Sequence, residues 1–249
     1  MQRSLHAGVA GGRPNAGIIH VPAGNSQVMS DKLTLYSYWR SSAAYRVRAA
    51  LNLKGLKYTI TPVHLVREGG EQHAEAYRAV NPQELVPSLE HGQRVLRQSM
   101  AIIEYVDETW PDRPLLPATA RDRARVRGLA QLVACEIHPL NNLRVLQFFE
   151  RTWNVPQPER ELWVRHWIEQ GFTALEQMLA ESPSTGTFCE GESPGLADCC
   201  LVPQIYNARR FGVSIDTYPT IARIEQACLA LDAFDAARPE NQPDAPDPA

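Results

Sequence analysis

Three short segments of the sequence combine residue types that could bind an anion and activate a nucleophile. In the first, two adjacent serines, Ser41 and Ser42, stand at the start of a run of helix-forming residues. Serine is a favoured N-cap residue, and the unpaired N–H groups of a helix N-terminus attract an anion or a thiolate. A serine hydroxyl there can donate a hydrogen bond to the same anion. As an isolated feature, the pair could also be plain helix caps.

The other two segments are Val86-Pro87, at the entry to an expected strand, and Gln98-Ser99, at the start of an expected helix. Proline lacks an N–H for a sheet ladder, so Val86-Pro87 indicates a turn, a cis peptide bond or an edge strand. A turn or a cis bond would expose the backbone of Val86 to a peptide-like ligand. The helix N-terminus at Gln98, capped by the Ser99 hydroxyl, suits a carboxylate, and a plain N-cap explains the same residues.

Arginines are frequent near these segments, although the chain of 249 residues has a formal net charge of -3. This balance argues against a broadly basic protein that binds nucleic acid. An arginine taken singly is most often solvated or ion-paired at the surface, and we expect this for most of them. The arginines concerned are Arg40, Arg46, Arg48, Arg144, Arg209 and Arg210.

Composition and spacing exclude several other classes of function. The seven histidines show no HExxH spacing and no cysteine partners, so no metal site is expected. The five cysteines form neither a disulfide framework nor a CxxC motif, which favours a reducing, cytoplasmic location. No stretch approaches the roughly 20 apolar residues of a membrane span. Asp198 is expected to cap a helix, and Cys199 and Cys200 to lie in the core.

A small α/β domain is expected to position the three segments. Strand-type alternation, helix caps and the turn signal His91-Gly92 give the order strand, helix, strand, short helix, two strands, helix. The expected ranges are 33–38, 44–53, 57–64, 71–79, 86–96 for the hairpin, and 100–109. A βαβ crossover followed by a hairpin predicts a sheet with both parallel and antiparallel pairs.

Only helical spacing follows a proline-rich joint that contains Pro111, Pro114 and Pro117. Helical patterns cover 121–150, 159–180, 196–210 and 218–230. We therefore expect a disordered leader at 1–30, an α/β domain at 31–112, a linker at 113–119, an all-helical domain at 120–238 and an extended tail at 239–249.

In combination, these motifs resemble those of the cytosolic glutathione transferases. The pattern Arg40-Ser41-Ser42, followed by Arg46-Val47-Arg48, is similar to the zeta class, which includes maleylacetoacetate and maleylpyruvate isomerases. The resemblance runs from about residue 32 to 246. It also rests on 81–87, 98–105, 137–142, 197–204, 207–211 and the tail motif Asn241-Gln242-Pro243-Asp244.

The resemblance implies a thioredoxin-like domain that binds glutathione, an all-α second domain and an electrophile site between them. It places the catalytic residues Ser41 and Ser42 beside the glutathione sulfur, and Arg40 and Arg210 on the carboxylates of a small dicarboxylic substrate. It further implies that glutathione is bound by Arg46, Gln72, Val86, Gln98, Ser99, His138, Asn142 and Arg144. The chain departs from the family at Ala43, where cysteine is common, and at His138, where the best-known members have glutamine.

The implied reaction is the glutathione-dependent cis–trans isomerisation of a maleyl-substituted diketo acid by reversible thiolate addition. A free thiol has a pKa of about 8.5, and lowering it by about two units requires roughly 2.7 kcal/mol. A helix dipole of about 0.3–1 kcal/mol and a charge-assisted hydrogen bond of about 1.5–3 kcal/mol reach this together.

Two alternatives remain at this point, a general transferase acting on electrophiles such as α-halo acids and a non-catalytic binding module. A thiol–disulfide oxidoreductase is disfavoured by Ala43 and by the missing CxxC motif. The motifs do not distinguish maleylacetoacetate from maleylpyruvate, and the resemblance also implies a homodimer.

Overall fold

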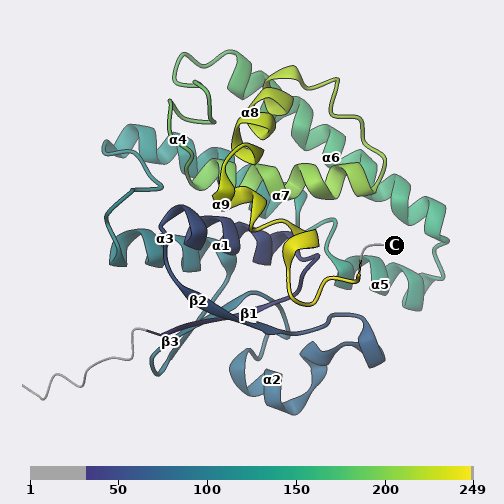
Figure 1. Ribbon diagram of the computed structural model, residues 1–249. Coiled ribbons are helices and arrows are strands. Elements are labelled where there is room, and N and C mark those ends of the chain that lie inside the picture. Colours follow the sequence, from purple (N-terminus) through teal and green to yellow (C-terminus); the bar gives the residue numbers. More distant parts are fainter. Residues whose placement is uncertain (1–31, 248–249) are drawn as a thin grey trace, which may run out of the picture. The chain divides into compact units, whose positions relative to one another are not determined.

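A four-stranded mixed sheet is the framework of the first part of the computed structural model, which describes residues 32–247 (Figure 1). The expected leader at 1–30 lies outside the described residues. The strands are β1 (Leu33–Ser37), β2 (Tyr58–Pro62), β3 (Ser88–His91) and β4 (Arg94–Arg97), in the order β2-β1-β3-β4. β1 is parallel to β2 and antiparallel to β3, and β3 is antiparallel to β4. The predicted combination of parallel and antiparallel pairs is confirmed.

Helices cover both faces of this sheet because alternate strand residues point to opposite sides. Leu33, Leu35 and Leu89 join the main apolar core with α1 (Ser42–Leu53) and α3 (Ser99–Thr109). On the other face, where Figure 1 shows α2 (Glu75–Val80), Tyr36 packs against Tyr77 with ring centroids 5.8 Å apart. The thioredoxin-like arrangement is therefore held by two separate apolar clusters.

The remainder is helical, as the spacing predicts. Its central element is α7 (Leu196–Arg210), which is almost entirely buried and packs against α1. Asp198 caps this helix by accepting a hydrogen bond of 2.8 Å from the Gly195 N–H. The other elements are α4 (Ala120–Gln131), η3 (Leu132–Ile137), α5 (Leu143–Trp153), α6 (Gln157–Ala180), α8 (Pro219–Leu229), α9 (Asp232–Asp235) and η4 (Pro239–Asn241).

The helical pattern expected over 121–150 is interrupted in the structure. After α4 the chain forms a π-helical turn, η3, and then leaves helical geometry before α5 begins. Pro139 lies in this break and lacks the N–H that a continuing helix would use. Gly171 of α6 permits a close approach here, since a Cβ on it would lie 2.3 Å from the Ile137 Cδ1. The break places His138 between the two helices.

Three boundaries differ from those expected for local reasons. α1 begins at Ser42, two residues early, because the Ser41 side chain accepts a hydrogen bond from the Ala44 N–H. α3 begins at Ser99, so the N-cap is Gln98 and not Ser99. The tail expected to be extended instead contains η4, and its Gln242 is buried. The proposed domain boundaries themselves remain a prediction.

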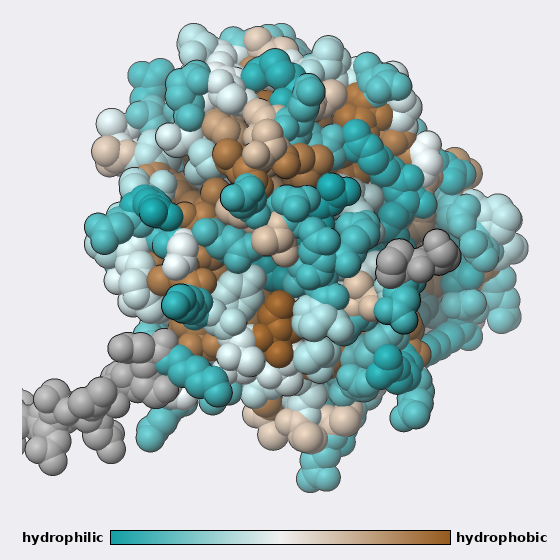
Figure 2. All heavy atoms as spheres, viewed as in Figure 1, coloured by the Kyte–Doolittle hydropathy of each residue, from teal (hydrophilic) through white to brown (hydrophobic). Residues whose placement is uncertain are grey.

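Hydrophilic residues dominate the face of the molecule shown in Figure 2, and hydrophobic residues form separate patches between them. Among the described residues, no helix is long and apolar enough to cross a membrane.

Candidate active site

Two adjoining cavities lie where the start of α1, the loop before β3, the break after η3 and the end of α7 meet. The first has a volume of about 130 Å³ and contains both serines, Ser41 and Ser42, in its wall. The second has a volume of about 260 Å³ and extends to Gln98 at the start of α3. Val86 and His138 line both cavities, so the two adjoin, and together they are called the cleft below.

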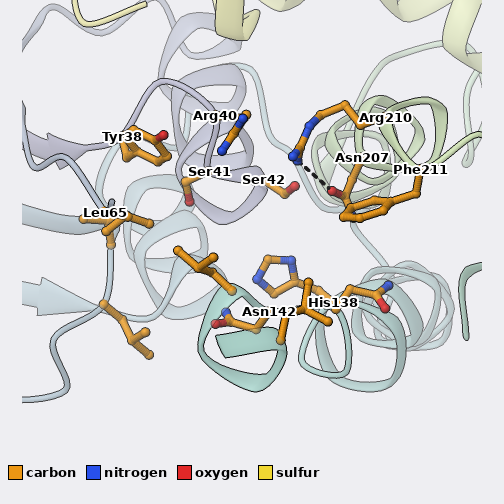
Figure 3. Close-up of a pocket in the computed structure, with 15 residues that line it drawn as sticks. Tyr38, Arg40, Ser41, Ser42, Leu65, His138, Asn142, Asn207, Arg210 and Phe211 are labelled. Atoms are coloured by element: carbon orange, nitrogen blue, oxygen red, sulfur yellow. Dashed lines mark hydrogen bonds between the residues drawn. The ribbon is translucent and has the colours of Figure 1, made fainter. Parts of the chain in front are cut away.

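The two serines differ in their hydrogen bonding. Ser41 is the N-cap of α1, and its Oγ accepts from the Ala44 N–H at 3.2 Å. This bond fixes the side chain and leaves its one proton available for a ligand. The side chain of Ser42 makes no hydrogen bond to any other residue in the described range, 32–247. Figure 3 shows both hydroxyls beside the cavity, between Arg40 and Arg210 on one side and His138 on the other.

The Val86–Pro87 peptide bond is cis, one of the alternatives left open by the sequence. The loop before it is held at the Leu85 carbonyl, which accepts from the Tyr77 hydroxyl and the Asn81 amide, both at 2.7 Å. Val86 is largely buried but lines both cavities. Val86 therefore lies in the cleft wall, where its backbone N–H and C=O could pair with an extended peptide.

A buried guanidinium lies behind the start of α3. Arg46 is 2% exposed, and its Nη1 donates to the Ser99 Oγ at 3.3 Å. Its Nε and Nη2 are buried without a hydrogen-bond partner, and no carboxylate among residues 32–247 pairs with it. Burial lowers the Arg46 pKa, an effect that the thiols of Cys200 and Cys135 reduce. This end of the cleft therefore combines a helix N-terminus, a hydroxyl and an uncompensated cation, which suits a carboxylate.

Polar residues from the break after η3 form the opposite wall. Asn142 caps α5 by accepting from the Arg144 N–H at 3.1 Å, and both residues line the second cavity. Burial, together with the charges of Arg46 and Arg144, lowers the pKa of His138 to about 3. A neutral imidazole keeps one ring nitrogen as an acceptor and the other as a donor, so it can hold a polar ligand without adding charge.

Two arginines without carboxylate partners line the first cavity (Figure 3). Arg210 donates to the Asn207 Oδ1 at 3.2 Å, one helical turn earlier on α7. Arg40 lies over the Trp39 ring at 5.3 Å and faces Arg210, whose pKa is lowered by burial and by the Arg40 charge. In residues 32–247, neither guanidinium forms a salt bridge. Two facing cations beside the serines suit a ligand with two carboxylates.

Not every predicted residue enters the cleft. Gln72 is buried against the Leu65 carbonyl at 3.3 Å and lines neither cavity, although Leu65 itself lines the first. The expectation that single arginines are at the surface is wrong for Arg46 and Arg48, which are both buried. It is confirmed for Arg209, which is half exposed and paired with Glu225 at 2.8 Å.

The sequence analysis missed several residues of the cleft wall. Leu65 and Leu146 line the first cavity and have apolar side chains that carry no motif. Asn207 could have been found, since its spacing of three residues from Arg210 places both on one helix face. The exposed Cys135 lines the second cavity, whereas the other four cysteines are buried. No group of three or more metal-ligating side chains occurs in the described part of the chain.

The cleft fits the tripeptide glutathione in its donor set. The backbone of Val86 in the cavity wall suits the middle of a peptide, and the unpartnered nitrogens of the buried Arg46 suit a terminal carboxylate. The N-terminus of α1, with the Ser41 hydroxyl, suits a thiolate.

Comparison with known proteins identifies the family. Residues 35–114 match the family model of the glutathione S-transferase N-terminal domain. The chain is 51% identical over 213 residues to a probable maleylacetoacetate isomerase of Vibrio cholerae, covering 86% of this chain and 98% of that protein. It is 47% identical to a holo maleyl pyruvate isomerase structure, described as a bacterial glutathione S-transferase of the zeta class. The match has a TM-score of 0.83 and covers 86% of this chain and 100% of the other. The chain belongs to the zeta class of glutathione transferases.

A third comparison bears on the ligands. The maleylacetoacetate isomerase structure from Anaeromyxobacter dehalogenans contains dicarboxyethyl glutathione and citrate in its active site. It is 44% identical to this chain with a TM-score of 0.77, and the match covers 88% of this chain and 99% of the other.

The family model and the solved zeta-class structure together confirm the predicted thioredoxin-like fold with a helical second part.

We predict that His138 makes the stability of the ligand-free protein depend on pH. Its pKa of about 3 lies below the value of about 6.5 expected in the unfolded chain, so the unfolded chain binds the proton first as the pH falls. Between pH 7.5 and 5, His138→Gln should therefore lose about 1 to 2 kcal/mol less free energy of unfolding than the parent protein. Urea denaturation of both proteins at the two pH values measures the difference. Equal losses of unfolding free energy in the two proteins would show that His138 takes up its proton at the same pH in the folded and the unfolded chain.

Proposed function

We propose that this zeta-class enzyme is a glutathione-dependent cis–trans isomerase of a maleyl-substituted diketo acid, maleylacetoacetate or maleylpyruvate. The observation that carries the proposal is the pair Arg40 and Arg210, which face each other without carboxylate partners beside the serine-capped start of α1. The substrates of both isomerase types carry two carboxylates, and the relatives named above are isomerases of these two types.

Glutathione is the cofactor of this reaction. When bound, it supplies a thiolate that adds reversibly to the cis double bond, which rotates as a single bond before glutathione leaves unchanged. In our proposal, the Val86 backbone pairs with its cysteinyl residue. Gln98, Ser99 and Arg46 hold the γ-glutamyl carboxylate, and His138, Asn142 and Arg144 line the rest of the cleft. A contact with Gln72 would require its buried, unpartnered Oε1 to become accessible.

Ser41 is our choice for the hydroxyl that stabilises the thiolate. Its side chain is already fixed by the bond from the Ala44 N–H, so little conformational freedom is lost when it donates to sulfur. A hydroxyl that accepts one hydrogen bond is also a stronger donor in the next. Ser42 is less constrained and is proposed as a second contact to the same ligand.

The arginines orient the substrate and stabilise negative charge. A guanidinium binds a carboxylate through two parallel N–H donors, which fixes direction as well as position. Asn207 holds the Nη1 of Arg210, and Arg40 comes from the loop that leads to Ser41. Both cations are in place before the reaction and therefore stabilise charge that develops on the substrate carbonyl oxygens without reorganising.

Two further proposals concern assembly and location. We propose a homodimer because the zeta-class resemblance implies one. We propose a cytoplasmic location because all five cysteines are free.

The isomerase proposal is tested by the amount of glutathione required. With glutathione at about one hundredth of the substrate concentration, the ultraviolet absorbance of the cis substrate should disappear completely at a steady rate. Maleylacetoacetate and maleylpyruvate are assayed side by side, and the larger kcat/KM identifies the substrate. Conversion that stops after one equivalent of glutathione would show a conjugating transferase instead. No conversion of either substrate, with no binding to immobilised glutathione, would favour a non-catalytic module.

We predict that Ser41→Ala lowers kcat at least ten-fold, or about 1.4 kcal/mol in the barrier. This change also removes a helix cap, which costs about 0.5–2 kcal/mol of stability, so Ser41→Gly is the control. Glycine at an N-cap costs only a few tenths of a kcal/mol, and this variant should be as slow as Ser41→Ala but more stable. Full activity of both variants, with a loss in Ser42→Ala, would assign the hydroxyl to Ser42.

We predict that Arg210→Ala raises the KM for the dicarboxylic substrate at least ten-fold and leaves glutathione affinity within about two-fold. The matched control is Arg209→Ala, since the neighbouring Arg209 is 51% exposed and pairs with Glu225 outside the first cavity. Its kinetics should stay within about two-fold of the parent protein. Steady-state kinetics with each ligand varied in turn separates these effects, and an unchanged KM in Arg210→Ala would remove Arg210 from the substrate site.

A further inference from the structure

The C-terminal segment that contains the motif Asn241-Gln242-Pro243-Asp244 has no role in the reaction described so far. In Figure 1 this segment runs beside α1. Backbone carbonyls within α9 and just after it accept hydrogen bonds from α1 side chains. The Asn52 amide donates to Ala233 at 2.9 Å, and the Arg48 Nε donates to Ala237 at 3.0 Å. The chain end is therefore fastened to the helix that begins at the serines.

Arg48 connects this segment to the loop between β1 and α1. Its side chain is fully buried, and its other nitrogens donate to Ser37 Oγ at 3.0 Å and to the Trp39 carbonyl at 3.1 Å. A weaker contact of 3.4 Å reaches the Tyr38 carbonyl. The Arg48 guanidinium thus binds the backbone carbonyl of Trp39, the residue that precedes Arg40.

Asp244 binds the backbone N–H of Trp39. Its Oδ2 accepts from the Trp39 N–H at 3.0 Å, across 205 positions of sequence. Two residues before Asp244, the buried Gln242 amide donates to the Ala236 carbonyl at 3.0 Å and to the Arg238 carbonyl at 2.7 Å. The second carboxylate oxygen of Asp244 is buried without a hydrogen-bond partner in the described residues.

We propose that Asp244 is a positioning residue, which fixes the Trp39 peptide and through it the Arg40 side chain and the Ser41 N-cap at the cleft. With Asp244 on its N–H and Arg48 on its C=O, Trp39 has both backbone groups bound by charged side chains. Ser41 extends this arrangement, because its N–H donates to the Tyr38 carbonyl at 3.0 Å. The active-site loop is thus held from the far end of the chain.

A purely structural role would predict a different result. If Asp244 only anchored the tail, its loss would lower the melting temperature without a selective effect on the loop or on the substrate site. If it positions the loop, its loss changes the Trp39 amide and the KM for the dicarboxylate, since Arg40 follows Trp39 directly. The kinetic part of this inference rests on the proposed function, whereas the amide measurement does not.

The experiment compares Asp244→Ala, Asp244→Asn and the control Asp247→Ala in the full-length protein. Asp247 is exposed and makes no hydrogen bond or salt bridge within 32–247, so its variant should match the parent protein in every measurement. Hydrogen–deuterium exchange of peptides that span 38–41 is measured by mass spectrometry, with steady-state kinetics and thermal melting alongside.

Asp244→Ala is expected to speed exchange in the peptides covering Trp39 at least ten-fold and to raise the KM for the dicarboxylate at least five-fold. Asparagine keeps an acceptor oxygen at the same place, so Asp244→Asn should restore protection and bring KM within about two-fold of the parent value. Unchanged exchange in Asp244→Ala would overturn the proposal, as would faster exchange with unaltered KM. If the parent protein shows no isomerase activity, the proposed function fails, and the exchange data alone decide whether Asp244 holds the loop.

Discussion

The structure depends on positive charge that is buried or unpaired at the cleft and is not neutralised by the protein itself. Arg46 is the extreme case, since it is buried with two nitrogens unpartnered. An ion withdrawn from water costs several kcal/mol unless it is paired and hydrogen-bonded. A carboxylate that enters the cleft would supply the missing partner, so ligand binding and the stability of this region should be coupled.

The same charges are divided between the two ends of the cleft. Arg46 and Arg144 lie in the second cavity, and Arg40 and Arg210 lie in the first. His138 lines both, and its lowered pKa keeps a fifth positive charge out of the middle. The overall net charge of -3 gives no indication of this concentration of cations, because it averages over the whole surface.

Local rules explain which parts of the fold and the site could be predicted. Strand alternation, helix caps and turn residues depend on near neighbours, and they located the mixed sheet and the segments that carry Ser41, Val86 and Ser99. The burial of Arg46 and Arg48 depends instead on elements distant in sequence, among them the carbonyl of Ala237. The left-handed backbone of Gln98, with φ of 71°, made it the N-cap in place of Ser99. A sequence pattern carries no direct signal for the burial of these arginines or for the backbone conformation of Gln98.

The π-helical turn η3 has a consequence for how the cleft tolerates change. Such a turn is an α-helical turn with one residue added. Deleting Leu132, Val133, Glu136 or Ile137, none of which lines either cavity, would let the segment close into a regular α-helical turn. His138 would then lose the wide turn that precedes it and sets its place in the wall of both cavities, although no residue lining the cleft had been substituted. The length of this segment is therefore as much a part of the site as the identity of its side chains.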